Sequence, residues 1–161
     1  SIPQDNKTPS LINCFDLYVE GETLEGENAW FNEKTGKKQH VKKKISYWSL
    51  PNILVVDIKR FNSQNKKNQI LVDFPIENLN LSKYVIGYKK ESYVYDLYGV
   101  CNHGGSVFGG HYTSYVKNAN GKWYHFNDTT VTEITDPTQI ISPKAYCLFY
   151  RKKTFSTFRK G

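Results

Sequence analysis

The chain has 161 residues, a formal net charge of +7 and a hydrophobic content of 39%. This length is typical of a single domain, and the apolar content is too high for a chain that stays disordered throughout. No apolar run reaches the roughly 18–20 residues of a membrane-spanning helix, and the N-terminus lacks the layout of a signal peptide, so we expect no membrane anchor.

The first predicted element is a short amphipathic helix over residues 11–19, after a lead-in of residues 1–9. Ser10 precedes apolar residues at helical spacing, which is typical of a helix start. Trp30 and Phe31 then begin an extended segment that runs into a turn over residues 34–37. Basic residues crowd together from Lys34 to Lys44, and we interpret them as the solvent-facing side of a hairpin.

The middle of the chain predicts a strand over residues 53–61, because a continuous β-branched run there ends in alternation. We expect this strand to be buried at its centre. A loop or hairpin tip over residues 62–68, a return strand over 70–74 and an irregular connection over 75–84 follow.

The second half predicts an antiparallel sheet, because aromatic and β-branched segments alternate with turns. Asp136-Pro137 predicts a short helix over residues 138–141, and residues 154–161 are expected to form a frayed tail. The expected fold class is therefore α+β, with strands over residues 93–102, 111–117, 122–126, 131–134 and 146–151.

A glycine-rich segment directly before His111 is the sharpest local feature. Gly104, Gly105, Gly109 and Gly110 lie within seven residues, which predicts a mobile loop at a site that an extended chain enters. A glycine-rich hairpin with a half-buried histidine is an equally good interpretation of the residues alone.

The segment from Trp123 to Thr129 supplies a candidate partner for that histidine. A hairpin through Asn120-Gly121 brings Asn127 and Asp128 back beside His111. A side-chain oxygen on one imidazole nitrogen fixes the tautomer and leaves the other nitrogen facing a nucleophile. The alternatives are that Asn127 and Asp128 are ordinary turn residues, or that Asn127-Asp128-Thr129 is an N-glycosylation site.

The chain has three widely spaced cysteines and no Cys-x-x-Cys pair. The three are Cys14, Cys101 and Cys147. They predict neither a disulfide framework nor a cysteine zinc site, and they favour a reducing compartment. We therefore expect an intracellular protein of the cytoplasm, the nucleus or both, which also disfavours the glycosylation interpretation.

From about Ser10 to Lys152 the chain resembles the C-terminal part of the catalytic domain of ubiquitin-specific proteases, the papain-like cysteine deubiquitinases. The segments that carry this resemblance are residues 10–17, 28–30, 50–54, 59–61, 98–105, 109–113, 123–128 and 145–150.

The resemblance implies roles for individual residues. It makes His111 the catalytic base, Asn127 its orienting partner and Asp128 an adjacent carboxylate. It also implies that the channel for the extended ubiquitin tail is bordered by Phe61, Gly109, Gly110 and Tyr112. The implied fold of residues 10–153 is the palm and fingers portion of the domain, a twisted antiparallel sheet with few short helices, with the thumb largely missing and one sheet face left exposed.

Two features depart from the family pattern. Relatives carry the nucleophile in an Asn-x-Cys box that this chain lacks, and none of its three cysteines suits that role. We therefore expect half an active site that is inactive without an N-terminal cysteine-box segment. Asn32 and Thr35 stand where many relatives place a zinc-binding Cys-x-x-Cys, so we predict no metal, and we expect no cofactor.

Three functions remain open on the sequence. The first is a thiol-dependent deubiquitinase whose partners are ubiquitin or a ubiquitinated protein and a missing N-terminal half or partner chain. The second is an inactive ubiquitin-binding pseudoenzyme. The third is a basic nucleic-acid-binding β domain, which only the +7 charge and the 15% aromatic content favour. Retention of both His111 and Asn127 favours the enzyme over the pseudoenzyme. We expect no nucleic-acid partner, because no RNA- or DNA-recognition motif accompanies the charge, and no membrane partner, because no apolar run is long enough to span a bilayer.

Overall fold

The computed structural model describes residues 1–4 and 8–154. Short 3₁₀ helices cover Gly26–Asn28, Ser82–Tyr84, Lys90–Ser92 and Pro137–Ile140. The other elements are α1 (Leu11–Val19), β1 (Glu22–Leu24), β2 (Trp30–Asn32), β3 (Lys37–Gln39), β4 (Val41–Lys43), β5 (Ile53–Asp57), β6 (Leu79–Asn80), β7 (Val94–Ser106), β8 (Gly109–Lys117), β9 (Trp123–Asn127), β10 (Thr130–Ile134) and β11 (Ala145–Lys152).

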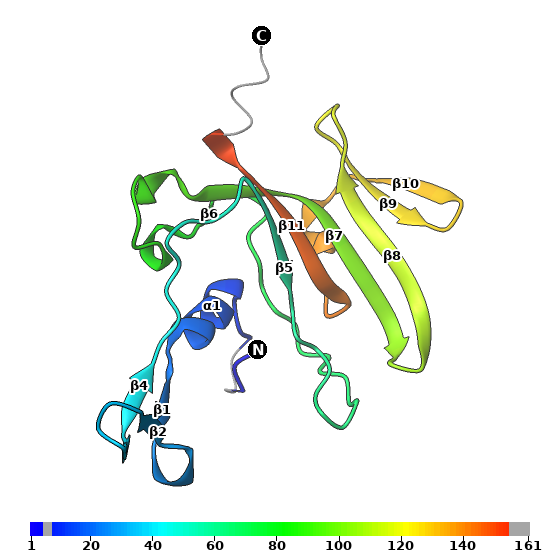
Figure 1. Cartoon of the computed structure of the whole chain (residues 1–161). Coiled ribbons are helices and arrows are strands. Elements are labelled where there is room, and N and C mark those ends of the chain that lie inside the picture. The colour runs from blue at the N-terminus through cyan, green and yellow to red at the C-terminus, as the bar shows by residue number, and fades with distance from the viewer. Residues whose placement is uncertain (5–7, 155–161) are drawn as a thin grey trace.

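One large antiparallel sheet dominates the structure (Figure 1). Its strand order is β10-β9-β8-β7-β11-β5, and β6 adds a short pairing to β7. Four strands that are consecutive in the chain, β7 to β10, are also neighbours in the sheet. Short turns connect them, as is usual for antiparallel strands. The expected α+β fold with an antiparallel sheet and few short helices is confirmed.

Helix α1 lies beside β5 at one end of the sheet (Figure 1). It spans the predicted residues because Ser10 caps it: the Asn13 backbone N–H donates to the Ser10 hydroxyl, and the Asn13 side chain accepts from the Ser10 backbone N–H. Leu11 is buried in the common core. The core side chains that are fully buried include Val72, Phe74, Leu79, Leu81, Tyr95, Leu97, Leu148 and Tyr150.

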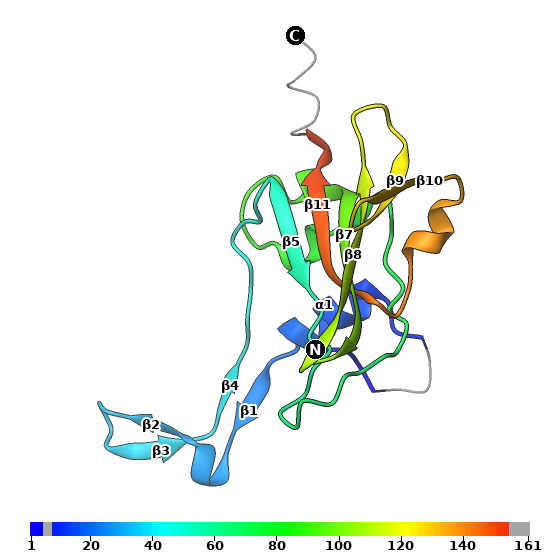
Figure 2. The same ribbon diagram turned by 90° about the vertical axis from the view of Figure 1, so that its right-hand side faces the viewer.

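Two small two-stranded sheets, β1–β4 and β2–β3, project away from the large sheet (Figure 2). All three residues of β3 are exposed, and so are Lys42 and Lys43 of β4. The basic segment is therefore a solvent-facing hairpin, as its composition predicts. No helix in the described ranges is long and apolar enough to cross a membrane.

Two strand predictions are wrong. Strand β5 is an edge strand that ends at Asp57, with Leu54 buried and Val55 52% exposed, so its apolar run is not covered on both faces. Residues 70–74 form no strand: the Asp73 backbone pairs instead with the segment before α1, where its carbonyl accepts from Leu11 N–H. Val72 and Phe74 alternate because they insert into the core, whether or not a neighbouring strand is present.

The remaining strands and the turn of helix after Asp136 lie close to their predicted places. Asp136 accepts from the Thr138 backbone N–H, which caps Pro137–Ile140. The predicted tail falls mostly on residues 155–161, which lie outside the described residues.

Candidate functional site

His111 and Asn127 meet where β8 begins and β9 ends. The register places Ser114 opposite Phe126, so the two strands run side by side toward these residues. The Nε2 atom of His111 lies 2.6 Å from Oδ1 of Asn127. Because an amide oxygen only accepts, Nε2 carries the proton and Nδ1 keeps its lone pair. The His111 side chain is exposed, so the alternative of a half-buried histidine is wrong.

Asp128 lies in the two-residue turn between β9 and β10, where Asn127 pairs with Thr130. Its backbone is left-handed, with φ of 50°, which aspartate tolerates better than most residues. Its exposed side chain makes no hydrogen bond or ion pair with the part of the chain that the structure describes. The structure therefore brings Asn127, and not Asp128, into contact with the imidazole.

The glycines before His111 belong mainly to the strands, so the segment is a glycine-rich hairpin and not the mobile loop of the other interpretation. Strands β7 and β8 stay paired as far as Ser106 and Gly109, so only Val107 and Phe108 form the turn. A Cβ atom on Gly110 would lie 2.3 Å from Nε2 of His103, and one on Gly105 would lie 2.7 Å from the Gly109 carbonyl oxygen. Close packing thus excludes a side chain at both positions, whereas Gly109 faces open space.

A pocket of about 290 Å³ lies beside this glycine segment. His103 is its central ring: its centroid is 4.7 Å from that of Tyr112, 5.9 Å from Phe61 and 6.5 Å from Tyr146. His103 is buried, whereas Tyr112 is 61% exposed. The pocket is lined by Asp57, Ile58, Lys59, Arg60, Phe61, Lys67, His103, Tyr112 and Tyr146.

Sequence reasoning assigned roles to Phe61 and Tyr112 but missed His103, Lys67 and Tyr146. The pairing of His103 with Tyr112 follows directly once the turn is centred on residues 107 and 108. Burial, together with the nearby Lys67 ammonium, lowers the pKa of His103. Burial also lowers the pKa of Lys67, with smaller contributions from Arg60 and Lys144.

The three thiols are poorly placed for nucleophilic chemistry. Burial raises the pKa of Cys14 and of Cys101, and it raises the pKa of Cys147 to about 11. Cys14 lines a separate pocket of about 460 Å³ between α1 and β5. A protonated thiol is a weak nucleophile, so these three half-buried cysteines suit apolar packing better than a nucleophilic role.

The described residues contain no cluster of three or more His, Cys, Asp or Glu side chains that could hold a metal ion. In the hairpin of β2 and β3, the Asn32 side chain accepts from the Lys34 backbone N–H and donates to Gln39. Asn32 therefore organises the turn with hydrogen bonds. That this hairpin binds no zinc stays a prediction.

The chain is similar in sequence to proteins of one known family. Residues 6–150 match the sequence profile of the ubiquitin carboxyl-terminal hydrolase family. Ubiquitin carboxyl-terminal hydrolase 4 of Pongo abelii is 43% identical over 158 residues, which cover 94% of this chain and 16% of the relative. Ubiquitin carboxyl-terminal hydrolase 12 of Saccharomyces cerevisiae is 42% identical, and the match covers 91% of this chain and 12% of the relative.

A solved structure of the SAGA DUB module, in which Ubp8, Sgf11, Sus1 and Sgf73 are bound to monoubiquitin, superimposes with a TM-score of 0.76 at 28% identity. The superposition covers 92% of this chain and 34% of that chain. The chain thus spans about a sixth of the length of the Pongo abelii relative and about a third of the length of this structural neighbour. The profile match and these identities show that the chain belongs to the ubiquitin carboxyl-terminal hydrolase family.

Proposed function

We propose that this chain supplies the histidine and asparagine half of a thiol-dependent deubiquitinase. The contact of 2.6 Å between His111 and Asn127 carries the proposal, because it fixes the tautomer that a general base requires. The proton sits on Nε2, so the Nδ1 lone pair is free to accept a proton from a thiol. The exposed ring leaves that atom within reach of another segment or chain.

In the reaction, His111 takes the thiol proton and the thiolate attacks the carbonyl carbon of the final ubiquitin glycine. His111 then returns the proton to the departing lysine amine, which breaks the isopeptide bond and leaves an acyl-enzyme. The same imidazole finally activates a water molecule that releases ubiquitin. Asn127 keeps the ring oriented throughout these steps, and Asp128 contributes a nearby negative charge.

The substrate tail enters beside the aromatic pocket. Phe61 and Tyr112 border the path, and Gly109 and Gly110 keep its floor low enough for a Gly-Gly terminus. Ubiquitin is therefore the proposed partner, and a structural neighbour is bound to monoubiquitin. The second partner is a cysteine-bearing segment, because burial keeps the three thiols of this chain protonated. We place the protein in a reducing intracellular compartment on its cysteine usage.

Covalent labelling with ubiquitin that carries a thiol-reactive C-terminal group tests the proposal. We expect no adduct with this chain alone, and an adduct with the polypeptide that joins it to a family cysteine box. His111→Ala should abolish that adduct, while Glu20→Gln, a control at the exposed end of α1, should leave it intact. Labelling that survives His111→Ala contradicts the mechanism. Ubiquitin binding without any adduct identifies a pseudoenzyme, and salt-sensitive retention of oligonucleotides identifies the nucleic-acid binder.

A further inference from the structure

Lys67 reaches across the aromatic pocket to His103 on β7. It comes from the opposite wall, where Phe61 and Lys67 close a small hairpin by a single antiparallel bridge. Its Nζ atom lies 3.2 Å from Nδ1 of His103, and the same ammonium donates to the His103 backbone carbonyl. The Lys67 side chain is therefore held by two atoms of one residue.

This contact determines where the His103 proton lies. A lysine ammonium has three N–H donors and no acceptor. Nδ1 must therefore present its lone pair to Lys67, and the single ring proton of a neutral imidazole must sit on Nε2. A protonated ring would set N–H against N–H and place two positive charges within hydrogen-bond distance.

The Nε2–H end of His103 faces Gly110, the residue directly before His111. A Cβ atom built on Gly110 would approach Nε2 to 2.3 Å. Within the described residues Nε2 makes no hydrogen bond, and it is not among the fully buried unpartnered polar atoms, although His103 as a whole residue is only 6% exposed. This N–H therefore keeps some exposure to solvent, and a ligand that brings a carbonyl oxygen to this point would accept a hydrogen bond from it.

The surroundings also oppose a charge on His103. Its ring packs against Phe61, Tyr112 and Tyr146, which cannot solvate a cation as water does. The charged groups that line the pocket are Asp57, Lys59, Arg60 and Lys67, three of them cationic. Burial lowers the pKa of His103, and Lys67 lowers it further.

We propose that Lys67 is a positioning residue that holds His103 as the neutral Nε2–H tautomer, so that His103 donates to a carbonyl oxygen of the substrate's glycine tail at Gly110. Neutrality also suits the proposed reaction, because a second positive charge near His111 would oppose its protonation. The tail contact rests on the proposed function, whereas the tautomer is a property of the chain itself.

Long-range ¹H–¹⁵N spectroscopy of the labelled chain tests the tautomer directly, because the four histidine rings give separable signals. His103→Gln assigns the ring. We expect the Nε2–H pattern for His103 and a titration midpoint below that of an unstructured histidine. Lys67→Met should raise the midpoint and admit the Nδ1–H form, and Lys67→Arg should restore the wild-type pattern. Lys66→Met, an exposed neighbour, should change neither.

An Nδ1–H pattern in the wild-type chain, or an unchanged His103 signal in Lys67→Met, overturns the proposal. The wild-type spectrum decides the matter even where Lys67→Met fails to fold. The second measurement uses the thiol-bearing polypeptide and the pH profile of kcat/KM for ubiquitin cleavage. Lys67→Met raises the His103 pKa, so the acid limb of the profile should move to higher pH, with a raised KM.

An unchanged KM in Lys67→Met refutes the tail contact, and an unmoved acid limb refutes the effect of the His103 charge on the reaction. Absence of cleavage in every variant refutes the proposed function instead, while the histidine spectra still decide the tautomer. The two failures are therefore distinguishable.

Discussion

The guanidinium Nε of Arg60 donates to the backbone carbonyl of Ala145 over 2.7 Å, across 85 residues of sequence. The Nη1 atom also donates to the carbonyls of Ile70 and Asn68, at 2.8 and 3.2 Å. Arg60 is only 2% exposed, and burial lowers its pKa. Through Nε and Nη1, with Nη2 buried and unpaired among the described residues, this cation joins the segment after β5 to β11 and to the loop that leads to the core.

Replacing this arginine should destabilise the fold. Arg60→Met leaves three carbonyls without their donor, and each buried unpaired group costs about 1–3 kcal/mol, so we expect a loss of roughly 3 kcal/mol or more in urea denaturation. Arg151→Met is the matched control: Arg151 is exposed and stacks on Tyr98, so its loss should cost about 1 kcal/mol or less. Equal effects of the two changes would contradict the role given to Arg60.

The asparagine beside His111 predicts a kinetic effect in the thiol-bearing polypeptide. Asn127→Ala removes the acceptor at 2.6 Å and should lower kcat by about 100-fold or more, with KM nearly unchanged, because the ring loses its orientation. Asn127→Asp keeps an acceptor oxygen and should retain activity within about tenfold. A rise in KM equal to the fall in kcat would show that Asn127 binds substrate instead.

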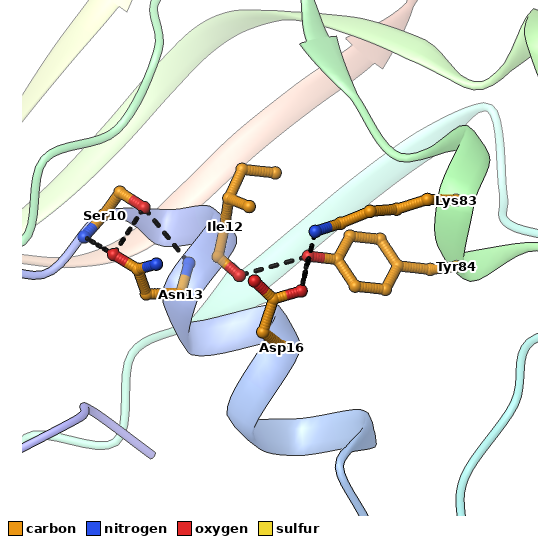
Figure 3. A network of polar contacts seen from close by, with 6 residues as sticks. All are labelled: Ser10, Ile12, Asn13, Asp16, Lys83 and Tyr84. Carbon is orange, nitrogen blue, oxygen red and sulfur yellow. Dashed lines mark hydrogen bonds and ion pairs between the residues drawn. The ribbon is translucent and has the colours of Figure 1, made fainter.

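The contacts of Asp16 in Figure 3 predict how stability depends on pH. Asp16 on α1 accepts hydrogen bonds from the Lys83 ammonium at 2.8 Å and the Tyr84 hydroxyl at 2.7 Å. These two bonds, with Lys83 the larger contributor, lower the pKa of Asp16. The folded state therefore binds the proton less readily than the unfolded chain. The stabilisation is fully present above pH of about 4 and is lost as the pH falls further.

Asp16→Asn removes this dependence. Since the carboxylate is half-exposed, we expect a loss of only about 0.5–1 kcal/mol at pH 7, and the difference from the wild type should shrink toward pH 2. Chemical denaturation at a series of pH values measures it. Glu20→Gln, a change on the exposed end of the same helix, provides the control. A difference that stays constant with pH would rule out the charged contact as its source.

The half-buried thiols predict slow alkylation. Because burial raises the pKa of Cys14, Cys101 and Cys147, the last to about 11, little thiolate exists at pH 7.5. Iodoacetamide should modify Cys147 roughly 100-fold more slowly than a free cysteine, and urea should remove the protection. Mass spectrometry of peptides follows each site. Rapid modification of any one thiol in the folded chain would identify an activated cysteine.

Local signals explain what the sequence predicts well. Helix α1 has its cap at Ser10 and apolar residues at helical spacing, and both signals lie within ten residues. The contact between His111 and Asn127 follows from one hairpin, since the turn at Asn120-Gly121 sets the register of β8 and β9.

Long-range packing explains what the sequence misses. Val72 and Phe74 alternate like a strand, but the backbone between them pairs with the segment before α1. Lys67 lies in a run of lysine, asparagine and glutamine that is typical of a solvated loop. Its contact with His103 joins residues 36 positions apart, and no local sequence pattern predicts this contact.

The position of β5 at the margin of the large sheet gives its amides two different environments. The Ile58 N–H donates to the Tyr146 carbonyl, so by alternation Leu54 and Val56 also point their amides toward β11. The amides of Ile53, Val55 and Asp57 point outward. Deuterium uptake along this strand should therefore alternate between slow and fast from one residue to the next. A docked segment that pairs with this margin would slow exchange at Ile53, Val55 and Asp57 and so remove the alternation. Deuterium uptake at these three amides would therefore report whether such a segment has bound.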